Sequence, residues 1–194
     1  MATVLLTGFE PFGTATSNPS GEIVKQISGD NIVTAILPVA YTQSGERLLA
    51  LIAEHNPDVV ISLGQAEGRT SITPEKVAIN LDDASLADNE GVMRNDVKIL
   101  DNGPDAYFST LPLKEIVETI KAAGIPAAVS LSAGAFLCNH VFYVAQHKFA
   151  GTNVRSGFVH VPLMDSQAFE FPGLPTMPLD QMVIAVRAML ELVT

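Results

Sequence analysis

The sequence predicts one α/β domain, and three observations carry this expectation. At 194 residues the chain is most simply a single domain over residues 1–194, long enough to bury a sizeable core. Hydrophobic residues make up 47% of it and charged residues only 16%, so we expect a folded protein. An order of apolar strand, glycine-containing loop and helix recurs along the chain, and ligands bind where such loops gather at the carboxyl ends of strands.

The charge balance argues against two classes of partner. Lysine and arginine number 11 against 21 aspartate and glutamate residues, which gives a formal net charge of -10. Such a surface repels phosphate backbones and anionic lipid, so we expect no nucleic acid and no membrane partner. No window of the sequence reaches the roughly 20 uninterrupted apolar residues that a membrane span needs.

Cysteine content and the N-terminal residues bear on the compartment. One cysteine, Cys138, rules out an internal disulfide, which is consistent with a reducing compartment. The start of the chain, MATVLLTGFEP, has neither a basic region nor a long apolar run, so we expect no signal peptide. A cytoplasmic protein is the expectation that follows. The apolar balance also leaves room for a subunit interface.

The first apolar run, Thr3–Thr7, predicts a strand that leads into the loop GFEPFGTATSNPSGE. Phe9 and Phe12 are unusual in this loop, because apolar rings there must either fill the core or line a pocket. The sequence leaves both possibilities open. The loop lacks the glycine and lysine spacing of a P-loop, so it is not expected to hold nucleotide phosphates in that way.

The following segments alternate between helical and strand patterns. We expect a helix, a strand, a second helix and a central strand, in this order: Pro19–Ser28, Ile32–Val39, Thr42–Asn56 and Asp58–Gly64. The central strand is nearly continuous in apolar residues, which is typical of a strand covered on both faces. A polar loop from Gly64 to Arg69 follows it.

The middle of the chain contains a carboxylate in an unusual place. Ile72–Leu81 alternates as a strand does, and Glu75 shares one side of it with two branched apolar residues. Glu75 therefore either sits at the exposed end of the strand or is held in a site. The polar stretch Asp82–Asp105 predicts a long irregular excursion, available for packing on another subunit, and Pro112–Ala123 predicts a helix.

The stretch around Cys138 predicts a strand, a turn and a helix. We expect a buried strand over Ala127–Leu131, a tight turn over Ser132–Gly134 and a helix that starts near Cys138. Free N–H groups and the dipole at a helix start favour an anion, which would lower the pKa of the thiol and suit a nucleophile. The other interpretation is a small, buried and inert side chain.

The C-terminal part predicts a strand over Gly157–Leu163 and a closing helix over Leu179–Val193. His160 is a polar group on the otherwise apolar strand. It is either a buried histidine satisfied by a backbone partner or a functional base, and the strand pattern alone does not decide between these.

A thiol nucleophile needs a base within hydrogen-bond reach, and that base needs an orienting group. His140 is close in sequence to Cys138, but residues two apart on a helix point about 200° away from each other. We expect His140 on a polar side of the helix with Tyr143 and His147, which leaves His160 as the better candidate. A Cys-x-His pair is no metal site on its own, since structural zinc needs four ligands, so we expect no metal.

Four segments, in order along nearly the whole chain, resemble those of one family, the pyroglutamyl peptidases of type I, also called pyrrolidone-carboxylate peptidases. The similar segments are TGFEPFG with NPSGE in the N-terminal loop, GQAEGRTSITPEKVAIN around the catalytic glutamate, SLSAGAFLCNHVFY around the cysteine, and GFVHVP around the histidine. One such match could arise by chance, whereas four in the right order are specific.

The resemblance implies a three-layer α/β/α sandwich with a mixed, mostly parallel central sheet, commonly a homotetramer, without metal or other cofactor. It implies a cysteine exopeptidase that removes an N-terminal pyroglutamyl (5-oxoproline) residue from peptides through a thioester acyl-enzyme. Cys138 would be the nucleophile, His160 the general base and later the acid, and Glu75 the group that orients the imidazole.

The substrate of this family sets the character of the pocket. Pyroglutamate is a neutral lactam without a free amine, so a flat apolar pocket with backbone donors and acceptors suits it. The resemblance implies that the main chain of Gln65 meets the lactam, with Asn18 nearby. The side chains that it implies as pocket lining are Phe9, Phe12, Leu86, Phe136 and Leu137.

The chain departs from the family pattern at three places. Glu67 stands where a second glycine is usual, Ser85 stands where a basic residue is common, and the loop Gly91–Arg94 differs. The alternative function is a non-catalytic α/β protein that binds a small lactam or a nucleoside-like ring. A nucleoside phosphorylase-like enzyme is a weaker reading, because the sequence lacks an evident phosphate cradle.

Overall fold

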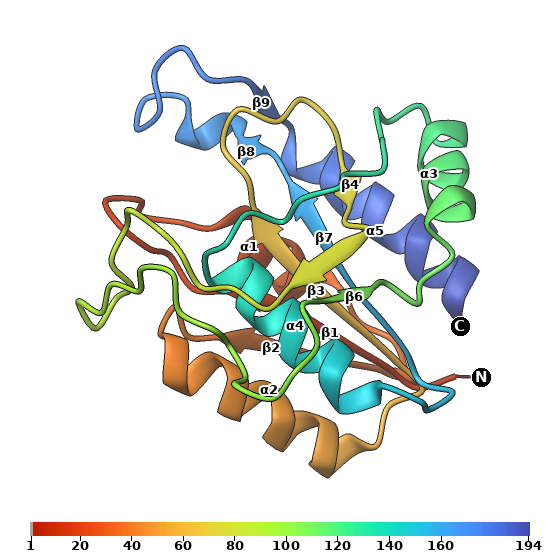
Figure 1. The fold of residues 1–194 in the computed structure, drawn as a ribbon. Helices are drawn as coiled ribbons and strands as arrows, with labels where there is room; N and C mark the ends of the chain where they lie inside the picture. Colours follow the sequence, from red (N-terminus) through yellow and green to blue (C-terminus); the bar gives the residue numbers. More distant parts are fainter. Residues whose placement is uncertain (1) are drawn as a thin grey trace.

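The computed structural model describes residues 2–194 and is built around a five-stranded sheet in the order β2-β1-β3-β7-β4 (Figure 1). Four of the strands run parallel, and β4 runs antiparallel to its neighbour β7. The strands are β1 (Val4–Phe9), β2 (Ile32–Leu37), β3 (Val59–Gln65), β4 (Thr73–Pro74) and β7 (Arg155–Val161). The predicted mixed, mostly parallel sheet is confirmed.

Helices cover both faces of this sheet and complete three layers (Figure 1). One face packs against α1, α3 and α5, and the other packs against α2 and α4. Their bounds are α1 (Pro19–Gln26), α2 (Tyr41–His55), α3 (Leu113–Ala122), α4 (Leu137–Phe149) and α5 (Leu179–Val193). No helix in the described part of the chain has both the length and the apolar character that crossing a bilayer requires.

The alternation of side chains along the parallel strands produces two hydrophobic cores. In β1, Val4 and Leu6 belong to the core on the α1, α3 and α5 side, whereas Leu5 belongs to the core on the α2 and α4 side. In β7, Val159 faces the first core and Phe158 the second. Successive strand residues point to opposite faces, so a continuous apolar run can bury both of its sides.

Two short sheets lie outside the main one. In the first, β5 (Val77–Ile79) pairs antiparallel with β6 (Ala106–Phe108). In the second, β8 (Leu163–Met164) pairs parallel with β9 (Thr176–Met177), and the 3-10 helix η1 (Asp165–Gln167) follows β8.

The prediction of one strand over Ile72–Leu81 is wrong. The chain pairs with β7 only as far as Pro74, which has no N–H to continue the ladder. Glu75 N still donates to Phe158 O at 2.9 Å, but Lys76 N donates to Ser130 O at 2.7 Å. The segment therefore leaves β7 at this point and continues as β5 in a different sheet.

The prediction of a buried strand over Ala127–Leu131 is also wrong. This segment is extended and forms two isolated parallel bridges, Ile72 with Ala127 and Glu75 with Ser130. Val129 is 39% exposed and Leu131 is 74% exposed. The run pairs with residues 72–76 along one side and forms an outer edge, so its apolar side chains are not all covered.

The excursion between β5 and β6 is irregular, as predicted, and it packs on α4 of its own chain. Tyr143 Oη donates to Pro104 O at 2.7 Å, and Asn139 Nδ2 donates to Leu81 O at 2.9 Å. His140 and Tyr143, on the predicted polar side of this helix, are buried against the excursion. His147 at the end of the same side is exposed.

Candidate active site

A cavity of about 290 Å³ lies where β1, β3 and β7 end and α4 begins. Phe9, Gln65, His160 and Leu137 line it, one from each of these four elements. In Figure 1 these strand ends converge beside the start of α4. The carboxyl ends of parallel strands are where open α/β sheets bind ligands, so the position agrees with the sequence prediction.

Cys138 is the second residue of α4, whose first residue is Leu137, and it lines the cavity as a free thiol. The predicted helix start is confirmed. Room for the sulfur comes from Gly64 on β3, because a Cβ added there would lie 2.8 Å from Cys138 Sγ. Gly64 is the register partner of His160, so these positions bring the thiol and the imidazole to one end of the sheet.

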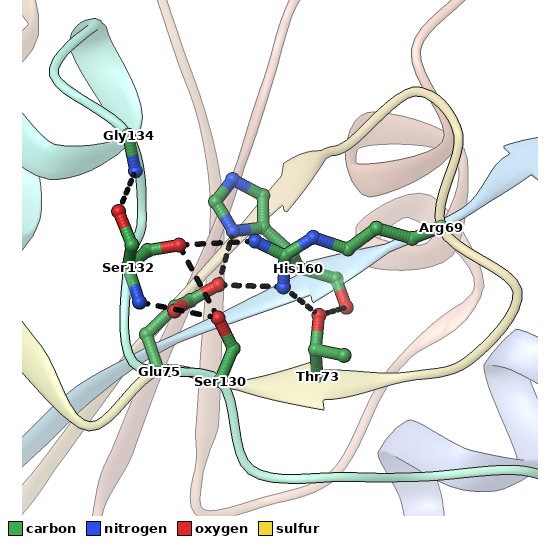
Figure 2. Close-up of polar contacts among 7 residues, drawn as sticks. All are labelled: Arg69, Thr73, Glu75, Ser130, Ser132, Gly134 and His160. Carbon is green, nitrogen blue, oxygen red and sulfur yellow. Dashed lines mark hydrogen bonds and ion pairs between the residues drawn. The ribbon is translucent and has the colours of Figure 1, made fainter.

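His160 lies on β7 and is 4% exposed, with its ring lining the cavity. Its Nδ1 donates to Glu75 Oε1 at 2.7 Å (Figure 2). This hydrogen bond assigns the proton to Nδ1 and leaves Nε2 with a lone pair that can accept a proton. The partner of this buried histidine is therefore a carboxylate and not a backbone group, which was one of the two possibilities left open by the sequence.

Glu75 is fully buried, so it does not sit at the exposed end of a strand. One oxygen, Oε1, accepts from His160 Nδ1 and also contacts Arg69 Nη1 at 2.8 Å. The other oxygen, Oε2, is buried without a hydrogen-bond partner among the described residues. A buried carboxylate is costly unless it is paired, and here an arginine and an imidazole share that task.

The protonation states of the thiol and the imidazole follow from burial. Burial lowers the pKa of His160, which the hydrogen bond to Glu75 opposes and the charge of Arg69 reinforces. Burial, followed by the negative charge of Glu75, raises the pKa of the Cys138 thiol to about 12, although Arg69 and a backbone hydrogen bond act the other way. At neutral pH both groups are therefore uncharged.

The predicted thiolate at the helix start is thus wrong for the resting protein. The N–H groups at the start of α4 do favour an anion, but their effect is smaller than the loss of hydration around the sulfur. A neutral thiol beside a neutral imidazole can react by general base catalysis, in which the proton moves as the sulfur attacks.

Six of the predicted binding residues line the cavity. They are Phe9, Phe12, Asn18, Gln65, Phe136 and Leu137. The ring of Phe12 faces that of Phe136 at a centroid distance of 6.2 Å. Phe9 is 3% exposed and packs near the Phe158 ring at 6.5 Å, so it both fills the core and lines the pocket. The side chain of Asn18 caps α1 by accepting from Ser20 N at 3.1 Å.

Leu86 is the predicted pocket residue that the structure does not bring to the cavity lining. Its side chain is 41% exposed on the excursion. The backbone just before it is fixed elsewhere, since Asp83 N donates to Ala135 O at 2.9 Å and Ala84 N donates to Arg94 O at 3.1 Å. Of the departures from the family pattern, Glu67 lines the cavity, whereas Ser85 is exposed outside it.

Sequence reasoning assigned no role to Arg69, which the structure places between Glu75 and the loop before α4. A signal was present, because Arg69 is the one basic residue between Gly64 and Glu75. A carboxylate that must be buried needs a cation or several donors nearby. The nearest arginine on the preceding loop was the obvious candidate.

A second cluster of a carboxylate, a histidine and an arginine includes His140, which lies in the first turn of α4. Asp82 is fully buried, and its Oδ2 accepts from His140 Nδ1 at 2.9 Å and from Arg94 Nη1 at 2.6 Å. The His140 ring meets Tyr41 edge-on, and the Arg94 guanidinium lies 4.5 Å from the centre of the Tyr41 ring. His140 is therefore occupied by a carboxylate of its own.

A free thiol and a neutral imidazole that line one cavity, with a buried carboxylate bound to the imidazole, are the groups that thiol-dependent acyl-transfer enzymes use. The chain belongs to the pyroglutamyl peptidase family, whose model matches residues 2–194. This membership confirms the resemblance seen in the sequence.

Individual relatives agree along nearly the whole chain. A pyrrolidone-carboxylate peptidase of Cupriavidus pinatubonensis is 48% identical over 195 residues, which cover 96% of this chain and 90% of that protein. Pyroglutamyl peptidase I of Bacillus amyloliquefaciens has a similar structure, with a TM-score of 0.94, 43% identity and coverage of 97% and 92%. A mutant pyrrolidone carboxyl peptidase of Pyrococcus furiosus gives a TM-score of 0.92 at 38% identity, covering 97% of this chain and 96% of that one.

Proposed function

We propose that this protein is a cysteine exopeptidase that removes the N-terminal pyroglutamyl residue from peptides through a thioester acyl-enzyme. The observation that carries the proposal is the 2.7 Å hydrogen bond between His160 Nδ1 and the buried Glu75, made by a histidine that shares its cavity with Cys138. Family membership supports the same activity.

The reaction begins with a proton transfer. His160 Nε2 accepts the proton of the Cys138 thiol while the sulfur attacks the pyroglutamyl carbonyl carbon. The carbonyl oxygen becomes an oxyanion, and the free N–H groups at the start of α4 are suited to hold it. Glu75 stabilises the imidazolium that forms, because its Oε1 already accepts from Nδ1.

The leaving amine then takes the proton from His160 Nε2 as the bond between the carbonyl carbon and the peptide nitrogen breaks. A pyroglutamyl thioester on Cys138 remains. Water enters, gives a proton to His160 and attacks the thioester; as the bond from carbon to sulfur breaks, pyroglutamate is released and His160 returns the proton to the sulfur, which restores the thiol. The imidazole serves as base, acid, base and acid in turn, so it ends the cycle in the neutral state in which it began.

The walls of the cavity suit the substrate. Phe12 and Phe136 provide a flat apolar surface for the lactam ring, and Phe9 and Leu137 extend it. None of these four side chains carries a charge, which fits a substrate end that has lost its ammonium group. We propose that the main chain of Gln65 supplies the polar contacts to the lactam, as the family resemblance implies.

Replacing the sulfur tests the proposed function directly. Cys138→Ala should abolish hydrolysis of a fluorogenic pyroglutamyl amide while the protein keeps its fold by circular dichroism, and Cys138→Ser should retain at most a trace. The alternative, a non-catalytic binding protein, predicts no turnover by the wild type and unchanged binding of 2-pyrrolidone in every variant. Turnover that survives in Cys138→Ala would refute the enzyme mechanism.

We also propose a homo-oligomer, with the tetramer implied by the family resemblance as the specific expectation, and a cytoplasmic location. Three strongly exposed apolar side chains support a subunit interface: Phe169 at 98%, Leu131 at 74% and Phe108 at 67%. The single cysteine supports a reducing compartment. Sedimentation equilibrium of the purified chain tests the oligomer, and a monomer at micromolar concentration would contradict it.

A further inference from the structure

Arg69 is the basic residue among the described residues that line the cavity, and the proposed chemistry does not use it. It lies on the loop between β3 and β4, lines the cavity and keeps 24% of its side chain exposed. Its guanidinium does not point freely into the cavity, because it is committed to three groups of the protein (Figure 2).

The first two contacts of the Arg69 guanidinium are with residues that hold His160, the proposed base. Nη1 contacts Glu75 Oε1 at 2.8 Å, the same oxygen that accepts from His160. Nη1 also donates to Thr73 Oγ1, and the Thr73 hydroxyl in turn donates to His160 O at 3.4 Å. Arg69 therefore contacts the carboxylate directly and reaches the backbone of the histidine through one side chain.

The third contact of the Arg69 guanidinium is with the loop that precedes Cys138, the proposed nucleophile. Nη2 donates to Ser132 O at 3.1 Å, on the loop that leads to α4. Ser132 Oγ accepts from Gly134 N at 3.2 Å, and Gly134 has a φ of +74°, which glycine adopts readily. Ala133 and Gly134 line the cavity immediately before the residues that start the Cys138 helix. Arg69 thus holds the loop that sets where α4 begins.

The guanidinium also sets the charge around the imidazole. His160 has Glu75 on its Nδ1 side, Arg69 next to that carboxylate, the Cys138 thiol at the same cavity, and the Phe158 ring at 4.9 Å. Without Arg69, a buried carboxylate would face the imidazole with no cation to balance it. The imidazole would then bind a proton more readily and would lose its capacity as a base near neutral pH.

We propose that Arg69 is a positioning residue that holds Glu75 and the Ser132–Gly134 loop together. In this role it keeps His160 and Cys138 in their positions relative to each other, and it keeps the imidazole unprotonated. The inference rests on the proposed function. A fork of donors is needed, because one guanidinium must reach a carboxylate and a backbone carbonyl in different directions.

Two variants of the full chain separate charge from geometry. Arg69→Met should lower kcat for a fluorogenic pyroglutamyl amide about 100-fold, the scale of a misplaced catalytic group, and change KM less. Its acid limb in the pH profile of kcat/KM should move to higher pH, because loss of the cation raises the pKa of His160. Arg69→Lys should return the acid limb toward its wild-type position but recover kcat only in part, since an ammonium group cannot reach both partners.

Arg94→Met is the matched control, because it removes the arginine of the other cluster and the same formal charge. It should leave the acid limb in place and kcat per folded molecule within about threefold of wild type. A fall in kcat for Arg69→Met without any movement of the acid limb would reduce Arg69 to a structural role and overturn the inference. Unchanged kinetics would overturn it as well.

These outcomes are distinct from a failure of the proposed function. If wild type does not hydrolyse the pyroglutamyl amide, the enzyme assignment falls. If wild type is active and Arg69→Met behaves like wild type, only the role of Arg69 falls. Should Arg69→Met not fold, the Arg69→Lys profile decides, because full kcat in that variant would contradict the need for a fork of donors.

Discussion

Two clusters in this molecule each join a carboxylate, a histidine and an arginine in the same way. In each, one oxygen of a fully buried carboxylate contacts a histidine Nδ1 and an arginine, and the other oxygen has no hydrogen-bond partner in the part of the chain that the structure describes. We refer to them as the Glu75 cluster and the Asp82 cluster; their members are Glu75, His160 and Arg69, and Asp82, His140 and Arg94.

The difference lies on the far side of each imidazole. His160 lines the cavity with Cys138, so its Nε2 has a space where a proton can be exchanged. His140 Nε2 lies against helix α2, where a Cβ added to Gly45 would be only 3.3 Å away, and the ring edge meets Tyr41. A carboxylate-oriented histidine therefore becomes a base only where its second nitrogen meets an open cavity and a nucleophile.

The Asp82 cluster joins two segments of the chain. Asp82 and Arg94 belong to the excursion between β5 and β6, and His140 belongs to α4. The cluster therefore fastens the excursion to the helix that carries Cys138. Under the proposed function, the Glu75 cluster serves the chemistry, whereas the Asp82 cluster attaches the excursion to α4.

Removing each histidine in a separate variant should produce the largest difference between the two clusters. His160→Ala should lower kcat/KM for a pyroglutamyl amide by about 10³-fold or more, because the reaction loses its general base. His140→Ala should leave kcat/KM per folded molecule within about threefold. Steady-state kinetics with folded protein quantified by circular dichroism checks both, and a comparable loss in the two variants would refute the distinction.

The Asp82 cluster should affect stability most. Asp82→Asn should lower the free energy of unfolding by about 3 kcal/mol, because it breaks a buried ion pair and weakens the attachment of the excursion. Asp83→Asn, which changes the exposed neighbouring carboxylate, is the control and should stay within about 0.5 kcal/mol. Urea unfolding followed by circular dichroism measures both. Equal stability of the two variants would show that the cluster contributes nothing to the fold.

A glycine lies next to each histidine, Gly64 next to His160 and Gly45 next to His140, and replacing each one tests the two clusters separately. A Cβ at Gly64 would lie 2.7 Å from Phe158 Cζ and 2.8 Å from Cys138 Sγ, so Gly64→Ala requires both contacts to be relieved by movement. We expect kcat/KM to fall about 100-fold from misplacement of the sulfur. Gly45→Ala, beside His140, should keep kcat/KM within about threefold. Wild-type activity in Gly64→Ala would mean that the position of the sulfur is not critical.

The pH dependence of kcat/KM reports on the His160 imidazole of the Glu75 cluster. Since burial lowers the pKa of His160 below its ordinary value of 6.5, the acid limb of kcat/KM should lie below pH 6.5. The unfolded chain binds a proton at this histidine near pH 6.5 while the folded chain does not, so the free energy of unfolding should decrease as pH falls from there toward the folded pKa. An acid limb above pH 6.5 would contradict the neutral resting imidazole.

The smallest expected effect is on substrate preference, and it comes from Glu67, a charged residue that belongs to neither cluster. Among the described residues lining the cavity, Glu67 and Arg69 carry charged side chains, and Arg69 is paired with Glu75. Glu67 is exposed, so a peptide with lysine after pyroglutamate should be favoured over one with glutamine by about two- to fivefold in kcat/KM. Glu67→Gln or high salt should remove the preference. A preference that survives in Glu67→Gln would assign it to another group.

Much of the fold and the site could be predicted because the signals are local. The helix start at Cys138 and the polar residue on the His160 strand are visible in short windows of sequence, and the family resemblance supplied Glu75 as their partner. The exposure of Leu131 could not be predicted, since an apolar run does not say whether one or both of its edges are paired.

Other features depend on contacts between distant segments. The pKa of the thiol depends on burial by the whole site, which outweighs the helix start that the sequence revealed. The angle along α4 predicts that His140 points away from Cys138, but it does not reveal that His140 is buried against Asp82, which lies on an irregular excursion far along the chain. Arg69 was visible as a loop residue, whereas its three partners come together only in the folded protein.

The most direct test of the account is to trap the acyl-enzyme in one variant of each cluster. Wild type, Glu75→Gln and Asp82→Asn are mixed with a pyroglutamyl ester, quenched with acid within milliseconds and analysed by mass spectrometry for a pyroglutamyl group on Cys138. The account predicts rapid thioester formation in wild type and in folded Asp82→Asn, and a much slower rate in Glu75→Gln. Formation at the wild-type rate in Glu75→Gln, or its absence in folded Asp82→Asn, would contradict the assignment of chemistry to the Glu75 cluster.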